Sequence, residues 1–270
     1  MILGISAIDP FIVTEFMPAG SSNAGNYNLK GKTAVTLDNT QNNGVIVTFG
    51  DSLGGNVVTS AFTPVNSNVL NFCIYNGATY NAVDPVLGCS MGGGVLGTGN
   101  MFTRLADSVQ GTGKFTKTLL VPTCMGSTGV VQWGADQFSK IKATFARLSA
   151  AGVTAKAVLI QLGANDSANG VLQAAYTSAQ TALIAQIRLY YAGPIFIATN
   201  TWYGGVVSAG IQAAQAAAVN HGSLIWAGAN GDTLNATNRQ ADNTHWNDTG
   251  AAAMAALWLT ALQAYGPPFT

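Results

Sequence analysis

The amino-acid sequence predicts an α/β protein whose parallel sheet is covered by helices on both faces. Short apolar runs of strand length recur along the 270 residues, and longer alanine-rich or amphipathic stretches separate them. Polar turn residues follow several of these apolar runs. Strands that alternate with helices pair in parallel through right-handed crossovers, and the helices then cover both faces of the sheet. The chain is long enough for one large domain of this kind.

Five apolar runs are expected to form the strands. The first, at 45–49, contains only β-branched and aromatic residues, which favour a buried strand. Gly50 ends it, and the Gly54-Gly55 pair allows a tight turn soon afterwards. The other four runs lie at 118–122, 157–163, 194–199 and 223–226.

Apolar residues at helical spacing predict helices between these strands. Met101, Leu105 and Val109 recur over 100–109, and an amphipathic stretch over 135–150 is ended by Gly152. Alanine-rich stretches predict further helices over 170–190, 206–220 and 249–264. The expected inner face of the helix over 170–190 consists of Leu172, Tyr176, Leu183 and Ile187.

The chain has no internal repeat and no interior linker, so residues 44–270 are predicted to form one domain. Residues 1–43 are rich in turn formers and are predicted to form an N-terminal appendage. An edge hairpin, a packing arm or an anchor to a larger assembly would each fit this segment. Residues 53–97 lack a helical period, and a loop of such length is usually functional or carries small strands of its own, so we expect it to shape one wall of a site.

The composition restricts the classes of partner. Only 8% of the residues are charged, against about 25% in typical soluble domains, and the formal net charge is zero. Without a basic patch, nucleic acid and anionic membranes are disfavoured as main partners. No apolar run is long and pure enough to span a bilayer, and residues 1–5 lack the basic start of a secretory signal peptide. The uncharged polar surface favours an extracellular or virion-associated protein over a cytosolic enzyme.

Three cysteines, Cys73, Cys89 and Cys124, show no spacing typical of a metal site or a disulfide framework. Cys73 and Cys89 flank a loop-like stretch, so one alternative is that they form a disulfide and leave Cys124 free. The other alternative is that all three are small buried hydrophobic residues.

A serine and a histidine are the first candidates for chemistry. Ser52 lies just past the strand at 45–49, where open α/β sheets place ligands, although a turn that merely contains serine is the alternative. His245 lies in a polar stretch before the last helix. The other histidine, His221, follows an alanine-rich helix, where the helix dipole favours histidine for structural reasons. We therefore predict that Ser52 is a nucleophile and His245 its base.

Two carboxylates compete to orient His245. Asp242 precedes it by three residues, and one tight turn with this spacing can bring the carboxylate to the far nitrogen of the imidazole. Asp248 follows His245 by three residues and is the rival, but it also suits the N-terminus of the last helix. We favour Asp242.

Four short blocks in the chain resemble, in order, those of the SGNH (GDSL-type) hydrolase family. They are Gly-Asp-Ser-Leu at 50–53, a turn at Gly126, Gly-x-Asn-Asp at 163–166 and Asp-x-x-His at 242–245. Each block alone is a weak match, but four in the family's order, at strand ends or before the last helix, are a strong one. The resemblance covers residues 44–260.

The resemblance implies a three-layer α/β/α sandwich with a five-stranded parallel sheet, a flavodoxin-like fold. It implies that Ser52 is the nucleophile, His245 the base and Asp242 its partner. It also implies an oxyanion hole made by the backbone N–H of Ser52, the backbone N–H of Gly126 and the side-chain amide of Asn165. No metal and no cofactor are implied.

The second block narrows the resemblance. The stretch at 120–133 is similar to that of the sialate O-acetylesterase and acetylxylan esterase branch, as is the helix that begins near 102. That branch usually has Gln where this chain has Asp51, and Glu-x-Asp or similar at Asn165-Asp166. Gly129 is an alternative to Gly126 as oxyanion donor, and Asn165-Asp166 also suits a turn that caps the following helix.

Three further residues are candidates for contact with the substrate. Trp202 follows the fourth strand, at the edge where the site is expected, and Trp246 follows His245. Asp51 precedes Ser52 and also suits a role in shaping its turn. Core packing is the alternative for both tryptophans.

These observations favour a serine esterase that removes small acyl groups, chiefly acetyl, from carbohydrate esters, with residues 44–270 as its catalytic domain. One alternative is a lipid esterase, thioesterase or acyltransferase of the same family. The other is a carbohydrate-binding or structural module, for instance on a virion, that keeps the fold without turnover.

Overall fold

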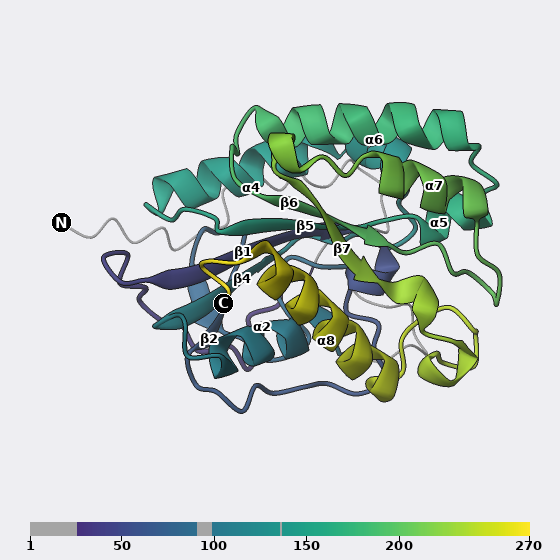
Figure 1. Ribbon diagram of the computed structural model, residues 1–270. Helices are drawn as coiled ribbons and strands as arrows, with labels where there is room; N and C mark the ends of the chain where they lie inside the picture. Colours follow the sequence, from purple (N-terminus) through teal and green to yellow (C-terminus); the bar gives the residue numbers. More distant parts are fainter. Residues whose placement is uncertain (1–25, 91–98, 136) are drawn as a thin grey trace.

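The computed structural model describes residues 26–90, 99–135 and 137–270, which form an α/β fold around one sheet (Figure 1). The sheet has seven strands in the order β3-β2-β4-β1-β5-β6-β7. All neighbouring strands are parallel except β3, which pairs antiparallel with β2. The strands are β1 (Asn43–Gly50), β2 (Val69–Phe72), β3 (Thr79–Asn81), β4 (Lys117–Pro122), β5 (Ala157–Gln161), β6 (Ile195–Thr199) and β7 (Ile225–Asn230).

Helices cover both faces of the sheet and make three layers. In Figure 1, α4, α6 and α7 lie on one face, whereas α2 and α8 lie side by side on the other. The α-helices are α2 (Met101–Gly111), α3 (Val130–Gly134), α4 (Phe138–Ala150), α5 (Ala164–Ala168), α6 (Gln173–Arg188), α7 (Ala209–Ala217) and α8 (Asp248–Tyr265). Short 3-10 turns are η1 (Ser52–Gly54), η2 (His221–Ser223), η3 (Gly231–Thr233) and η4 (Ala236–Asn238).

The central strand β1 is apolar on both sides because it separates two hydrophobic cores. Val45, Val47 and Phe49 pack into the core shared with α4 and α6, whereas Ile46 packs into the core shared with α2 and α8. All eight residues of β1 are buried. Successive side chains of a strand point to opposite faces, so this uninterrupted apolar run is what a doubly covered parallel sheet requires.

The structure confirms the predicted fold class and corrects the number of strands. The five predicted strands correspond to β1, β4, β5, β6 and β7, but β2 and β3 lie within 53–97, where small strands were possible but none was located. Asn71 explains the failure, because this polar residue interrupts the apolar pattern of β2 although it is fully buried. Its side chain accepts from the Leu87 N–H and donates to the Leu87 carbonyl, which satisfies it inside the core.

The described part of the N-terminal segment runs along this added edge of the sheet. The Val35 N–H donates to the Thr79 carbonyl, and the Asn26 N–H donates to the Cys89 carbonyl. The predicted boundary at residue 43 coincides with the start of β1. Residues 1–25 lie outside the described residues, so an appendage over 1–43 stays a prediction.

One smaller expectation is wrong, and the cysteines follow the second of their two alternatives. Leu172 is 76% exposed and precedes α6 as its N-cap, whereas Tyr176, Leu183 and Ile187 are buried on the inner face as expected. Cys73 and Cys89 do not form a disulfide, since all three cysteines are free and buried. Instead, the Cys89 thiol donates to the Gly54 carbonyl, beneath the turn that carries Ser52.

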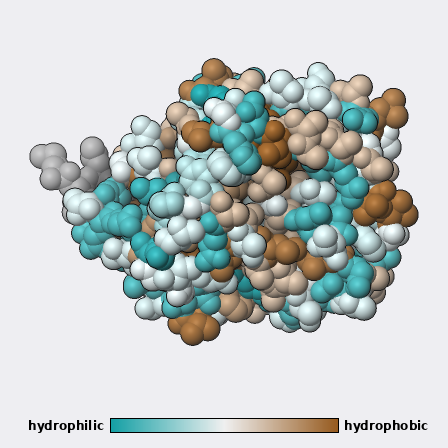
Figure 2. All heavy atoms as spheres, viewed as in Figure 1, coloured by the Kyte–Doolittle hydropathy of each residue, from teal (hydrophilic) through white to brown (hydrophobic). Residues whose placement is uncertain are grey.

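The visible face of the molecule mixes hydrophilic, intermediate and hydrophobic residues, with apolar groups in separate small clusters (Figure 2). Among the described residues, no helix combines the length and apolar character needed to cross a membrane.

Candidate active site

Ser52 lies on a sharp turn at the carboxyl end of β1. The Asp51 carboxylate accepts from the Leu53 N–H at 3.0 Å and so caps η1, which Ser52 begins. The turn packs so closely that a Cβ on Gly50 would lie 2.4 Å from the Gln161 carbonyl oxygen. Glycine before and after Asp51-Ser52-Leu53 therefore allows the turn to press against the neighbouring strands, with Ser52 half-buried at the sheet edge.

A continuous hydrogen-bonded chain joins Ser52, His245 and Asp242. The Ser52 Oγ lies 2.9 Å from His245 Nε2, and His245 Nδ1 lies 2.5 Å from Asp242 Oδ2. The other carboxylate oxygen of Asp242 accepts from the backbone N–H groups of Thr244 and His245. A hydroxyl, an imidazole and a carboxylate in this arrangement have the geometry of general-base activation of a nucleophile.

The charge of Asp242 decides which nitrogen of His245 carries the proton. Partial burial acts to raise the pKa of Asp242, but hydrogen bonds from the His245 ring and from the backbone prevail and hold it below its usual value. An ionised Asp242 accepts the proton on Nδ1. Nε2 of a neutral imidazole is then the acceptor for the Ser52 hydroxyl, which is the tautomer that a base requires.

The loop that carries Asp242 and His245 is held by the loop after β6. Asn243 adopts a left-handed conformation with φ of 54°, which turns the chain between the two catalytic candidates. The Trp202 indole N–H donates to the Asn243 carbonyl at 2.9 Å, and the Gly204 N–H donates to the Thr244 hydroxyl at 2.9 Å. This support fixes the turn in which the three-residue spacing brings carboxylate and imidazole together.

A buried arginine supports the same loop from beneath. Arg239, only 4% exposed, donates to the carbonyls of Thr244 and Gly231 at 2.8 and 3.0 Å. Its guanidinium lies 3.5 Å from the centroid of the Trp246 ring. Trp246 in turn donates from its indole N–H to the Leu53 carbonyl at 3.1 Å. Burial lowers the pKa of Arg239 to about 10, so it stays charged at neutral pH. Through Trp246 it links the loop at 242–246, which holds the candidate base and is called the base loop below, to the turn at 50–55, which holds the candidate nucleophile and is called the nucleophile turn.

Arg239→Met is expected to destabilise the fold and to slow turnover. The Thr244 and Gly231 carbonyls lose their charged donor, which costs about 1–3 kcal/mol of unfolding free energy for each. Displacement of the base loop is expected to lower kcat about 10- to 100-fold. Urea unfolding and ester hydrolysis below the melting temperature measure the two effects.

Arg188→Met is the matched control, because Arg188 also donates to backbone carbonyls but lies where α6 returns to the amino ends of the strands. It should lose stability and keep kcat. An Arg239→Met enzyme with wild-type kcat would contradict the positioning role.

Two further segments lie close to the turn at 50–55, one after β4 and one at the start of α5. Gly126 follows β4, and a Cβ on it would lie 3.7 Å from the Ser52 Cβ. Its N–H donates to the Ser90 hydroxyl at 2.7 Å. Asn165 lies in the first turn of α5 and is half-buried. It lines an open cavity of about 510 Å³ together with Ser127, Val131, Gln132, Asp166, Asn169 and Val171.

Two buried carboxyl groups join the nucleophile turn to these segments. Asp166 accepts from the Val130 N–H with both oxygens, and burial raises its pKa to about 6. Burial, together with the nearby Asp166 charge, raises the pKa of Asp51 to about 7, although hydrogen bonds from the N–H groups of Leu53, Asn165 and Ala164 act to lower it. Asp51 therefore faces the start of α5, next to Asn165.

The raised pKa of Asp51 predicts that the free energy of unfolding falls as the pH rises towards 7. Between the usual value of 3.8 and about 7, the folded chain keeps a proton that the unfolded chain releases. Unfolding is then favoured by rising pH, with a slope of at most about 1.4 kcal/mol per pH unit. Asp51→Asn does not titrate, so urea unfolding from pH 4 to 8 should give it a shallower slope than the wild type. Equal slopes would show that Asp51 keeps an ordinary pKa.

The structure corrects two predicted substrate contacts. Trp246 is fully buried and Asp51 is 1% exposed, and both make internal hydrogen bonds, so neither presents a surface to a ligand. Trp202 is half-buried and supports the base loop through its indole N–H. Contact between its exposed part and a substrate stays a prediction.

The alternative candidates for the orienting carboxylate, the base and the oxyanion donor are Asp248, His221 and Gly129, and each makes other contacts. Asp248 begins α8 and accepts from Arg104 and from the Ser60 N–H, not from His245. His221 begins η2 and stacks on the Trp226 ring at 3.9 Å. The Gly129 N–H donates to the Gln132 side chain.

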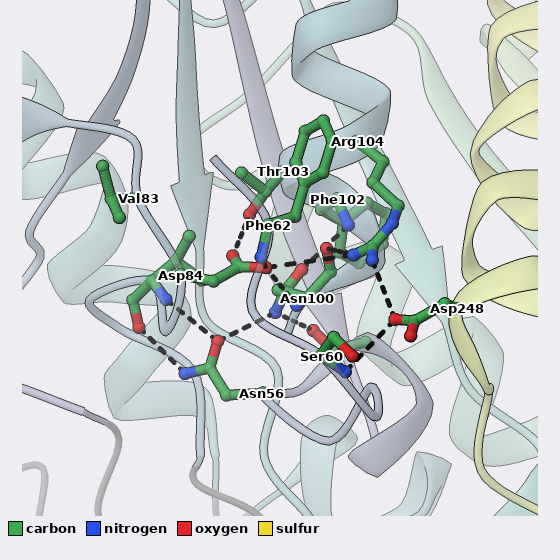
Figure 3. Close-up of polar contacts among 12 residues, drawn as sticks. Asn56, Ser60, Phe62, Val83, Asp84, Asn100, Phe102, Thr103, Arg104 and Asp248 are labelled. Atoms are coloured by element: carbon green, nitrogen blue, oxygen red, sulfur yellow. Dashed lines mark hydrogen bonds and ion pairs between the residues drawn. The ribbon is translucent and has the colours of Figure 1, made fainter. Parts of the chain in front are cut away.

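A polar network joins the described part of the 53–97 segment to α2 and to the start of α8 (Figure 3). Buried Asp84 accepts from the Asn100 N–H, and the Asn100 side chain donates to the Gly54 carbonyl at 3.0 Å. Arg104 lies between Asp84 and Asp248, with 3.0 Å to the latter. Apolar spacing in the sequence predicted α2, which carries Arg104, but no local pattern identified Arg239 or Ser90.

Comparison with solved structures identifies proteins of similar fold. A protein of Arabidopsis thaliana is 20% identical, with 84% of this chain and 99% of that chain covered and a TM-score of 0.63. A carbohydrate esterase of family 3 from Talaromyces cellulolyticus is 10% identical, with 82% and 96% covered and a TM-score of 0.51. The family 3 carbohydrate esterase of Clostridium thermocellum is 12% identical, with 83% and 96% covered and a TM-score of 0.50.

Comparison with protein-family models and with curated proteins gives no match. At these low identities the structural likeness is one of fold. The sheet order, its helical layers and these neighbours together show that the chain has an SGNH hydrolase-like fold.

Proposed function

We propose that this chain is a serine esterase that removes small acyl groups, chiefly acetyl, from carbohydrate esters. The observation that carries the proposal is the chain of hydrogen bonds from Ser52 through His245 to Asp242, with 2.9 and 2.5 Å between successive heavy atoms. Residues from two distant parts of the sequence meet at the carboxyl edge of the sheet in the order that acyl transfer requires. A binding module without turnover would have no need of this alignment.

In the proposed reaction, Ser52 Oγ attacks the ester carbonyl while His245 Nε2 takes its proton. The carbonyl oxygen becomes an oxyanion, for which the Ser52 N–H and the Asn165 side-chain amide are proposed donors. Collapse of the tetrahedral intermediate breaks the bond to the leaving alkoxide, and His245 returns the proton to that oxygen. Water then attacks the acyl-enzyme with His245 again as base, which releases the carboxylic acid and restores Ser52.

The cavity next to Asn165 supports a carbohydrate as the alcohol part of the ester. Ser127, Gln132, Asn165 and Asn169 contribute uncharged donors and acceptors to its lining. Neutral amides and hydroxyls match the hydroxyl groups of a sugar, which act both as donors and as acceptors. The similar folds include two proteins described as carbohydrate esterases of family 3, which agrees with this choice of substrate class.

A panel of esters tests the proposal. We expect turnover of 4-nitrophenyl acetate, a lower kcat/KM for the butyrate and octanoate esters, and release of acetate from an acetylated oligosaccharide. A preference for butyrate or longer chains would favour a lipid esterase or thioesterase over a sugar deacetylase. Failure of the folded protein to hydrolyse any ester would contradict the esterase itself.

A further inference from the structure

Ser90 is a buried serine beside the turn that carries Ser52. Two backbone hydrogen bonds hold this residue in place. The Ser90 N–H donates to the Cys124 carbonyl and the Asn56 N–H donates to the Ser90 carbonyl, both at 2.9 Å. The residue is only 4% exposed. These bonds fix Ser90 between the segment after β4 and the turn after β1.

The Ser90 hydroxyl lies beside the nucleophile. A Cβ on Gly55 would lie 3.1 Å from both the Ser52 carbonyl oxygen and the Ser90 Oγ. A Cβ on Gly126 would lie 3.3 Å from the Ser90 Oγ and 3.7 Å from the Ser52 Cβ. Two glycines that flank the nucleophile from different segments therefore both face this hydroxyl.

The Gly126 N–H, which the family resemblance assigns to the oxyanion, is occupied. It donates to the Ser90 Oγ at 2.7 Å. An N–H that makes this bond has no second proton for an oxyanion, but the hydroxyl that accepts it keeps its own proton for donation. The accepted bond also polarises the hydroxyl and strengthens it as a donor.

We propose that the Ser90 hydroxyl donates directly to the oxyanion and that the Gly126 N–H acts behind it, through the bond that it gives to Ser90. The inference rests on the proposed esterase function and changes one member of its oxyanion hole. No proton is transferred in this role, and Ser90 contributes one hydrogen bond that strengthens as negative charge develops on the carbonyl oxygen.

Ser90→Ala separates the two assignments by the sign of its effect. If the hydroxyl donates to the oxyanion, kcat for 4-nitrophenyl acetate should fall about 10²- to 10³-fold while KM changes little. If the Gly126 N–H is the direct donor, removal of its competing acceptor should leave kcat unchanged or raise it. An unchanged or higher kcat overturns the proposal.

Ser90→Cys guards against a folding defect, because the thiol nearly keeps the volume of the side chain but donates weakly. It should show a similar loss of kcat, and Ser90→Thr, which keeps a hydroxyl, should recover most of it. A Ser90→Cys variant with wild-type kcat would overturn the proposal. Ser108→Ala on α2, whose hydroxyl donates to the Arg104 carbonyl away from the site, should match the wild type.

Ser52→Ala, assayed in parallel, distinguishes a failure of the proposed Ser90 role from a failure of the proposed esterase mechanism. An inactive Ser52→Ala with a fully active Ser90→Ala would leave the esterase intact and reject the role of Ser90. An active Ser52→Ala would reject the esterase mechanism itself.

Discussion

Ser52→Ala is expected to abolish ester hydrolysis, with kcat reduced by about 10⁴- to 10⁶-fold. The loss is this large because the acyl group has no other acceptor at the end of the hydrogen-bonded chain, so His245 and Asp242 have nothing to activate. Hydrolysis of 4-nitrophenyl acetate under first-order conditions measures the loss over the uncatalysed background.

The fold should survive this substitution. Ser52 is half-buried, and the turn around it is held by Asp51 and by closely packed glycines rather than by the Ser52 hydroxyl. Circular dichroism and thermal unfolding should therefore match the wild type. A folded Ser52→Ala enzyme with more than a few per cent of the wild-type kcat would mean that another group is the nucleophile.

Asp242→Asn is expected to lower kcat by about 10³- to 10⁴-fold at neutral pH. The Oδ2 that accepts from His245 Nδ1 would be replaced by an amide nitrogen, which donates. The imidazole would then place its proton on Nε2 and lose the lone pair that receives the Ser52 proton. The pH–rate profile of kcat/KM measures the effect, and activity should recover partly at high pH.

Asp248→Asn is the matched control, because this second carboxylate also lies three residues from His245 in the sequence. It pairs with Arg104 and the Ser60 N–H instead of with the imidazole. We expect it to keep kcat within about threefold of the wild type, because Asp248 bonds to Arg104 and Ser60 and not to the imidazole. Loss of this partly exposed ion pair should also change stability little, by about 0–1 kcal/mol. The reverse result, with Asp248 essential and Asp242 dispensable, would reassign the residue that orients the base.

The parts of the fold that were predictable are those with a regular local pattern. The strand at 45–49 and the helix over 135–150 follow from apolar periodicity, which tertiary packing only reinforces. β2 was missed because Asn71 breaks its apolar run, and the partner that makes this burial tolerable is Leu87, sixteen residues away in the sequence. A satisfied buried amide of this kind has no signature in a local pattern.

The same distinction separates the predictable and unpredictable parts of the site. Ser52, Asp242 and His245 could be proposed from the sequence because a strand end, a three-residue spacing and a position before a helix are local features. Arg239 supports the base loop through backbone carbonyls that carry no sequence information. Ser90 acquires its place only when the long segment after β1 folds back onto the segment after β4.

The identity of the nucleophile is the central claim, and covalent trapping tests it most directly. The folded chain would be treated with diethyl 4-nitrophenyl phosphate and its intact mass and peptide map recorded. We predict that the wild type gains one diethylphosphoryl group, on Ser52. The group should form slowly or not at all in Asp242→Asn and should be absent from Ser52→Ala. A wild-type chain that remains unmodified, or an adduct that persists in Ser52→Ala, would contradict the serine esterase mechanism.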